Sequence, residues 1–385
     1  MKIEYSENLK KIPPYAFAEI SRKKKAMAAK GIDLVDLGIG DPDLPTPKDI
    51  IAAMQKAVAD PATHRYPMDA GRQDFREAWA KWCKRRFGIR IDANQVQALM
   101  GSKEGLCNLA RAFVNPGDRV LVPDPGYPGY ANGATLLTGG LPIKMPLLES
   151  NSYLPDFGRI NRSDAKDAKL MYLNYPNNPT GAVADKDFYG EAVDFCADND
   201  IILVSDNPYS EITYDGFKAP SVFEVDGAMD VAIEMHSFSK TYNMTGWRLG
   251  AAYGNPEIVA ALSKVKENID SGVFEAVQVA GIYALEHYSS APAMGEYGKR
   301  MNLIVEAFNK IGIPAKKPKG TFYLWAKVPR GETSRGFVDK VLEKAHVVLT
   351  PGTAFGEHGE GYFRASITSS TERIKEAANR IEKLK

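Results

Sequence analysis

A lysine lies among hydroxyl groups and close to an arginine, just after an apolar stretch. Ser237, Ser239, Lys240 and Arg248 fall within twelve residues of one another. A lysine in a semi-enclosed site can have a lowered pKa and form a Schiff base with an aldehyde. The hydroxyl groups and the guanidinium could hold a phosphate nearby. A lone lysine would be read as a surface residue, but these neighbours favour a reactive one.

An aspartate follows a second apolar run. Asp206 comes after residues 201–204 (Ile-Ile-Leu-Val) and Ser205, and is followed by Asn-Pro and Tyr209. A carboxylate at the end of a buried strand is costly unless a cation partners it. A protonated pyridine nitrogen would be such a partner, and the pairing would keep a pyridine cofactor able to accept electrons. The alternative is an aspartate that caps the next turn.

Three further loops carry groups that could bind a planar, phosphorylated ligand. Residues 174–181 (Asn-Tyr-Pro-Asn-Asn-Pro-Thr-Gly) form a rigid turn that directs amide groups, or only a strand-end turn. Residues 101–105 (Gly-Ser-Lys-Glu-Gly) lie between a strand and a helix, where backbone N–H groups bind anions. Their spacing is not that of a Walker loop. Tyr127 could stack on a heterocycle or lie in the core.

Arg364 stands inside a strand-like run, residues 361–366. Packing explains an arginine there poorly, whereas a bidentate clamp on a carboxylate explains it well. A surface salt bridge is the alternative.

These groups need a scaffold, and the apolar pattern indicates one. Seven short apolar runs alternate with helical stretches such as 185–199 and 256–269, which predicts an α/β fold with a largely parallel sheet. The runs are 96–100, 119–122, 141–145, 170–173, 201–204, 233–236 and 249–253. Sheets of this kind bind ligands at the carboxyl ends of their strands, where the polar loops fall. We therefore expect one site.

The pattern changes after about residue 285. Amphipathic helices are predicted at 296–310, 334–344 and 370–385, with strands at 321–327 and 363–367 between them. We predict a large cofactor-binding domain at 45–285. Residues 1–44 and 286–385 form a smaller α+β domain in this interpretation.

Composition excludes several classes of protein. The 385 residues include 49 basic and 48 acidic side chains, a net charge of +1 that argues against nucleic-acid binding. Cys83, Cys107 and Cys196 are too few and too far apart for a disulfide framework or a metal pair, so no metal is expected. The basic cluster at 22–25 is read as the solvated face of a helix. No segment resembles a membrane span or signal peptide, so we expect a soluble cytoplasmic protein.

Together these segments resemble the fold-type I pyridoxal-phosphate enzymes of the class I and II aminotransferase family. The resemblance runs from about residue 32 to 380, and the motifs occur in the family's order and spacing. It implies a pyridoxal 5′-phosphate cofactor and a seven-stranded, mostly parallel sheet. It also implies transfer of an amino group from an amino acid to a 2-oxo acid.

The resemblance implies a role for each candidate residue. Lys240, Asp206 and Tyr209 would be catalytic: the Schiff-base lysine and proton carrier, the partner of the pyridine nitrogen, and a donor to the phenolic oxygen. Asn178 would donate to the same oxygen and face the substrate, and Tyr127 would stack on the ring. The positions around the phosphate would be Ser102, Lys103, Ser237 and Arg248.

Further residues correspond to family positions that meet the substrate or the neighbouring subunit. Arg364 matches the arginine that binds the α-carboxylate, and Gly40 the glycine of the N-terminal segment that closes over the substrate. Tyr66 matches the tyrosine that reaches the phosphate from the neighbouring subunit, which implies a homodimer. Lys103 could also hold a distal carboxylate.

Within the family, the chain most resembles enzymes that move an amino group from LL-diaminopimelate to 2-oxoglutarate. The similar stretches are 37–47, 101–105, 113–118, 175–183, 239–248 and 268–274. Many of these enzymes read Tyr-Pro-Ser-Tyr-Glu-Gly where this chain reads Tyr-Pro-Met-Asp-Ala-Gly at 66–71. Asp69 would replace the glutamate that meets the distal ammonium. An aspartate- or alanine-type aminotransferase, or a lyase, stays an alternative.

Overall fold

A seven-stranded sheet forms the centre of the molecule. The computed structural model describes residues 1–13, 18–289 and 291–384. The sheet order is β2-β8-β7-β6-β5-β3-β4. The strands are β2 (Val96–Leu99), β3 (Arg119–Asp124), β4 (Leu141–Pro146), β5 (Ala168–Leu173), β6 (Ile202–Asp206), β7 (Ala232–Ser237) and β8 (Gly250–Gly254). Only β8 runs antiparallel to its neighbours. The predicted seven-stranded, mostly parallel α/β sheet is confirmed.

Helices cover both faces of this sheet, which is why the central strands are apolar on both sides. Successive side chains of a strand point to opposite faces. Val204 of β6 packs in a cluster with α5 (Ser102–Phe113) and α10 (Pro256–Glu267). Leu203 packs in a cluster with α7 (Lys186–Asp198) on the other face. The helices α3 (Lys48–Val58), α4 (Gln73–Phe87) and α11 (Glu275–His287) pack near β2 and β8.

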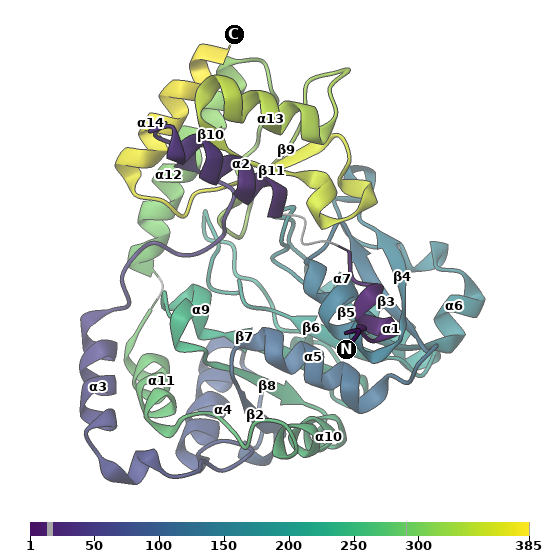
Figure 1. Ribbon diagram of the computed structural model, residues 1–385. Coiled ribbons are helices and arrows are strands. Elements are labelled where there is room, and N and C mark those ends of the chain that lie inside the picture. The colour runs from purple at the N-terminus through teal and green to yellow at the C-terminus, as the bar shows by residue number, and fades with distance from the viewer. Residues whose placement is uncertain (14–17, 290, 385) are drawn as a thin grey trace.

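Two small sheets and three helices form a second layer of structure. One sheet pairs β11 (Thr350–Pro351), β12 (Tyr362–Ser366) and β9 (Tyr323–Lys327) antiparallel. The other pairs β1 (Val35–Asp36) with β10 (Val347–Val348) in parallel. The helices are α12 (Ala291–Lys310), α13 (Ser334–Ala345) and α14 (Thr371–Ile381). Figure 1 shows these elements gathered above the large sheet, with α2 (Ala18–Ala29) beside them.

The domain boundaries, 45–285 and 1–44 with 286–385, are retained as a proposal. The strands of the large sheet fall within the first range, and those of the two small sheets fall within the second. The shorter helices are α1 (Glu7–Lys10), α6 (Arg162–Asp167), α8 (Ala228–Val231) and α9 (Phe238–Thr241).

The predicted helices and strands are present in the structure, with their ends shifted by a few residues. The C-terminal helix is shorter than predicted: α14 ends at Ile381, a 3₁₀ turn follows, and Lys385 lies outside the described residues. The basic cluster at 22–25 lies on α2, but it is only partly the solvated face that was expected, because Lys23 pairs with Asp339 and Lys24 pairs with Asp36. Strands β1, β10 and β11 have two residues each, too few to show any alternation in the sequence.

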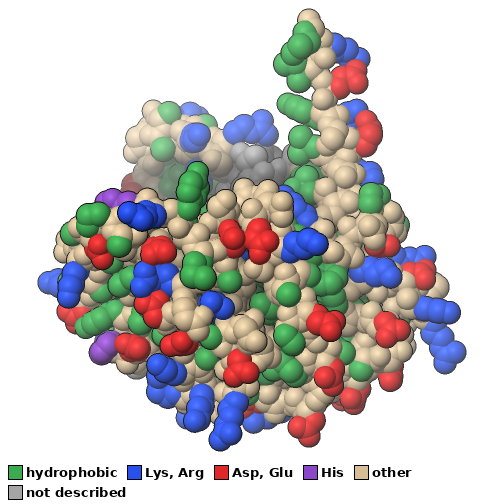
Figure 2. Space-filling model, turned by 90° about the horizontal axis from the view of Figure 1, so that it is seen from below, with side chains coloured by type: hydrophobic (Ala, Val, Ile, Leu, Met, Phe, Trp, Pro, Cys, Tyr) green, Lys and Arg blue, Asp and Glu red, His purple; other side chains and the backbone are tan. Residues whose placement is uncertain are grey.

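The surface mixes both signs of charge. On the face drawn in Figure 2, acidic and basic side chains are interspersed, with hydrophobic side chains scattered between them. Among the described residues, no helix combines the length and apolarity that crossing a membrane requires.

Candidate active site

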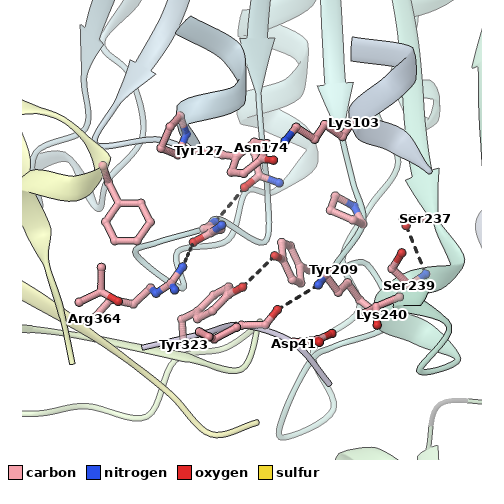
Figure 3. Close-up of a pocket in the computed structure, with 18 of the residues that line it drawn as sticks. Asp41, Lys103, Tyr127, Asn174, Tyr209, Ser237, Ser239, Lys240, Tyr323 and Arg364 are labelled. Atoms are coloured by element: carbon pink, nitrogen blue, oxygen red, sulfur yellow. Dashed lines mark hydrogen bonds between the residues drawn. The ribbon is translucent and has the colours of Figure 1, made fainter. Parts of the chain in front are cut away.

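A cavity of 690 Å³ lies between the carboxyl ends of the large sheet's strands and the small sheets. Each predicted loop contributes to it: Ser102 follows β2, Tyr127 follows β3, Asn178 follows β5, Asp206 ends β6 and Ser237 ends β7. The opposite wall comes from Arg364, Tyr323 and the segment 38–41 (Figure 3). The predicted loops therefore meet at one cavity, which is built by the large sheet on one side and the small sheets on the other.

Asp206 is held from two sides at the end of β6. Its Oδ2 accepts a hydrogen bond of 2.6 Å from the Tyr130 hydroxyl, and its backbone carbonyl accepts one of 2.7 Å from Asn174 Nδ2. Its Oδ1 is buried and makes no hydrogen bond. Burial raises the pKa of this carboxyl to about 7, although the Tyr130 and Ser102 hydroxyls act in the opposite direction. An orphaned, buried acceptor is suited to a cationic partner.

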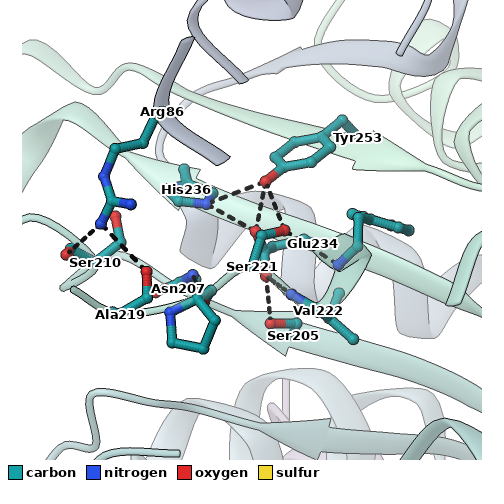
Figure 4. A network of polar contacts seen from close by, with 12 residues as sticks. Arg86, Ser205, Asn207, Ser210, Ala219, Ser221, Val222, Glu234, His236 and Tyr253 are labelled. Atoms are coloured by element: carbon teal, nitrogen blue, oxygen red, sulfur yellow. Dashed lines mark hydrogen bonds and ion pairs between the residues drawn. The ribbon is translucent and has the colours of Figure 1, made fainter. Parts of the chain in front are cut away.

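A second carboxylate lies on the opposite face of the sheet. Glu234 of β7 is fully buried, and its oxygens bind Ser205 Oγ (2.8 Å), the Val222 amide (3.1 Å) and His236 Nε2 (3.0 Å), with Tyr253 Oη also in contact (Figure 4). Burial alone would raise the pKa of Glu234, but these hydrogen bonds hold it below its ordinary value. The resulting negative charge adds slightly to the raised pKa of Asp206.

Lys240 projects from the short helix α9 into the cavity. Its Nζ donates a hydrogen bond of 3.0 Å to the carbonyl of Gly40. Burial lowers the pKa of Lys240 to about 8; Asp41 opposes this shift, and the positive charges of Arg364 and Arg248 reinforce it. More of this amine is therefore unprotonated at neutral pH than the ordinary pKa of 10.5 would allow, which favours its action as a nucleophile.

Arg248 and the start of α5 form a cationic cradle. Gly101 has a φ of +77°, and a β-carbon there would overlap Arg248 Nη2. Only glycine lets the guanidinium approach the N-terminus of α5 this closely. Ser102, Lys103 and Ser237 also line this cavity. Backbone N–H groups at a helix start, hydroxyl groups and a guanidinium together suit a phosphate.

Arg364 lies across the cavity on β12 and is buried. Its Nη1 donates to Asn178 Oδ1 at 2.8 Å, and its Nη2 donates to the Gly38 carbonyl at 2.7 Å. The guanidinium lies over the rings of Tyr323 (4.2 Å) and Phe355 (4.6 Å). The alternative of a surface salt bridge is wrong, because the arginine faces the cavity.

Tyr209 and Gly40 meet at Tyr323. The hydroxyls of Tyr209 and Tyr323 lie 3.1 Å apart. A β-carbon on Gly40 would overlap the Tyr323 hydroxyl, so this position requires glycine. The N-terminal segment therefore packs tightly against the small sheet at Gly40.

Two predicted residues do not reach the cavity of this chain. Tyr66 is 91% exposed, and Asp69 holds Gln97 Nε2 by its backbone carbonyl at 2.7 Å. Neither lines the cavity. Their roles stay predictions that need a second copy of the chain.

Sequence reasoning missed Tyr130 and Tyr323. Tyr130 stands three residues after Tyr127, beyond a Pro-Gly pair, and this spacing is the only sequence signal for it. Tyr323 fell within a predicted strand, where an aromatic residue needs no special explanation. Asn174 was inside a motif, but nothing distinguished it from its neighbours.

One cluster of potential metal ligands occurs among the described residues, away from Lys240 and Asp206. It consists of Asp124, Glu357 and His358. Lys144 already pairs with Asp124 at 3.7 Å and with Glu357 at 2.9 Å. The cluster is explained by these ion pairs.

Comparison with known proteins connects this geometry to a family. The family model for aminotransferase class I and II matches residues 32–381. The chain belongs to the class I and II aminotransferases. This aminotransferase is 51% identical to LL-diaminopimelate aminotransferase from Aquifex aeolicus, over 99% of both chains. It is 49% identical to the enzyme of the same name from Moorella thermoacetica, over 99% of this chain and 98% of the relative.

A solved structure shows the same fold. The structure of BacF from Bacillus subtilis is 40% identical, superposes with a TM-score of 0.94, and covers 100% of this chain and 98% of its own. The fold-type I architecture that the motifs implied is thereby confirmed.

Enzymes of this family use pyridoxal 5′-phosphate, and the cavity of this aminotransferase fits it. The unpartnered Oδ1 of Asp206 matches a protonated ring nitrogen. The cradle at Gly101 and Arg248 matches the phosphate, and the weakly basic amine of Lys240 matches the aldehyde.

Proposed function

We propose that this aminotransferase takes an amino group from LL-diaminopimelate and passes it to 2-oxoglutarate. The substrate assignment rests on the 51% identity, over 99% of both chains, to an enzyme named LL-diaminopimelate aminotransferase. Several other relatives of the same name are 46–49% identical over almost the whole chain. This identity is higher than that to BacF, 40%.

The charges of the cavity support substrates with two carboxylates. Arg364 and Lys103 both line it, and Figure 3 shows them on opposite sides. Arg364 would hold the α-carboxylate by two parallel hydrogen bonds. Lys103 would attract the distal carboxylate as a point charge. LL-diaminopimelate and 2-oxoglutarate each carry two carboxylates.

The residues of the chain would then divide the chemistry. When bound, pyridoxal phosphate would supply an aldehyde for the substrate amine and a ring that accepts electrons from the substrate Cα. Asp206 would keep the ring nitrogen protonated, and Tyr209 and Asn178 would donate hydrogen bonds to the phenolic oxygen. Lys240 would remove the proton from Cα and return it to C4′, acting first as base and then as acid.

Other residues would hold the cofactor without reacting. Ser102, Lys103, Ser237 and Arg248 would bind the phosphate, and Tyr127 would stack on the ring. Gly40 would let the N-terminal segment close and exclude water.

We also propose a homodimer with shared active sites. Tyr66 is almost fully exposed, and Met68 beside it is 57% exposed, which leaves this segment free to contact a second subunit. In that arrangement Tyr66 would reach the neighbour's phosphate. Asp69 would face the distal ammonium of the substrate.

Half-reaction spectra test the substrate assignment. Protein saturated with pyridoxal phosphate is mixed separately with LL-diaminopimelate, glutamate, aspartate and alanine, and conversion to the pyridoxamine form is followed. Rapid conversion by LL-diaminopimelate and glutamate only is expected. Rapid conversion by aspartate or alanine and none by LL-diaminopimelate would favour the alternative aminotransferases. A lyase need not convert the cofactor with glutamate.

A further inference from the structure

A fully buried lysine lies outside the machinery described above. Lys266 of α10 has 0% of its surface exposed. Its Nζ pairs with Glu104 Oε2 at 3.0 Å and with Asp270 Oδ2 at 3.0 Å. Burying the Lys266 ammonium beside two largely covered carboxylates is costly, and replacing such a group by apolar side chains would often be as stable. This cost suggests that the three residues hold something in place.

The first carboxylate leads to the cationic cradle. Glu104 Oε2 also accepts the Met100 amide at 3.0 Å. The carbonyl of Met100 in turn accepts Arg248 Nη2 at 3.2 Å. Hydrogen bonds on both sides of the Met100 backbone therefore connect the buried Lys266 ammonium, through Glu104, to the Arg248 guanidinium in the cavity.

The second carboxylate leads to the exposed segment at residues 66–69. Asp270 Oδ1 accepts the Gly272 amide at 2.9 Å. Gly272 has a φ of +95°, and a β-carbon there would lie 2.7 Å from the Met68 carbonyl. The backbone at Gly272 thus packs directly against the backbone that carries Tyr66 and Asp69.

We propose that Lys266 is a positioning residue that fixes both the cradle and the 66–69 segment. One ammonium neutralises two carboxylates that would otherwise repel each other, and each carboxylate orders one of the two backbones. Without the ammonium, Glu104 would turn away, and the Met100 amide and Arg248 would lose their fixed geometry. This inference rests on the proposed role of the cradle as the phosphate site.

Binding of two related probes tests whether Lys266 orders the cationic cradle. The affinity of the cofactor-free protein is measured for pyridoxal 5′-phosphate and for pyridoxal, which lacks the phosphate. Lys266→Met keeps the length of the side chain and removes its charge. The variant should bind pyridoxal phosphate about tenfold more weakly and pyridoxal within about twofold of wild type. Equal losses for both probes, or no loss for either, would overturn the proposal.

Two milder variants test the two carboxylates separately. They also provide the test if Lys266→Met does not fold. Glu104→Gln should lower the affinity for pyridoxal phosphate relative to that for pyridoxal, and it should leave amide hydrogen exchange at residues 68–71 unchanged. Asp270→Asn should speed that exchange and leave that relative affinity unchanged. Identical behaviour of the two variants would contradict the proposal.

The same binding data show whether the phosphate-site assignment or only the role of Lys266 has failed. If wild-type protein binds pyridoxal as tightly as pyridoxal phosphate, the cradle does not bind phosphate, and the proposed site is wrong. If wild type prefers the phosphate and Lys266→Met shows the same preference, only the role of Lys266 is wrong.

Discussion

Single residues in the cavity carry shifted proton affinities, and burial is the main cause. The Asp206 carboxyl has a pKa raised to about 7, and the Lys240 amine has one lowered to about 8. Each shift disfavours the charged form in the cofactor-free chain. A protonated pyridine nitrogen would reverse the shift at Asp206, since an opposite charge favours the carboxylate.

Asp206 should therefore make the stability of the cofactor-free chain depend on pH. Its pKa is higher in the folded chain (about 7) than the ordinary value of 3.8, so its stabilising contribution is complete below pH 3.8 and is lost as pH rises through about 7. Between pH 5 and 8 the wild type should lose roughly 2–4 kcal/mol relative to Asp206→Asn. Urea unfolding of both proteins measures this, and parallel pH profiles would refute it.

Arg364 should be sensitive to a change that preserves its charge. Arg364→Lys keeps the positive charge and loses the paired donors that bind a carboxylate. We expect kcat/KM for LL-diaminopimelate to fall about ten- to a hundredfold, mostly through KM. Steady-state kinetics measure this. An effect below twofold would mean that another residue binds the α-carboxylate.

At the scale of elements, the strands were predictable because each is a short apolar run followed by a polar loop. All seven runs overlap strands of the large sheet, and the loops after β2, β3, β5, β6 and β7 meet at one edge, as parallel strands require. The wall that closes the cavity was less predictable. The Gly38 carbonyl and Arg364 are 326 residues apart in sequence, and no local pattern reports such a contact.

The π-helical segment at Gly129–Leu136 could not be predicted from local sequence patterns either. It places Tyr130 against Asp206, yet its sequence has neither helical nor strand periodicity. The residues proposed to react were identified from their chemical types. The residues that hold them depend on tertiary packing.

Gly40 should tolerate no side chain, because the N-terminal segment packs against Tyr323. Gly40→Ala should cost about 1–3 kcal/mol through overpacking and sharply reduce turnover. Gly190→Ala is a matched control on α7, where an added β-carbon meets no atom within 4 Å. It should gain about 0.5–1 kcal/mol, since alanine favours helices. Thermal unfolding and activity of both variants test this, and equal stability changes would disprove it.

At the scale of the whole molecule, the proposed dimer makes each site dependent on two chains. Inactive Lys240→Ala and Tyr66→Ala subunits should complement each other, because a mixed dimer holds one site with both residues intact. Random reassociation should restore about a quarter of wild-type activity. Mixing the two variants after mild dissociation and assaying turnover measures this. No recovery, with mixed dimers demonstrated, would place Tyr66 outside the neighbouring site.

The central claim is that Lys240 carries the proton at the substrate Cα. The most direct measurement is exchange of that hydrogen for deuterium when LL-diaminopimelate is incubated in D₂O with protein saturated with pyridoxal phosphate. Wild type and Lys264→Ala, which changes an exposed lysine, should exchange it and form the 2-oxo acid. Lys240→Ala should still bind the cofactor but show neither exchange nor product. Exchange by Lys240→Ala at a rate near that of wild type would contradict the account.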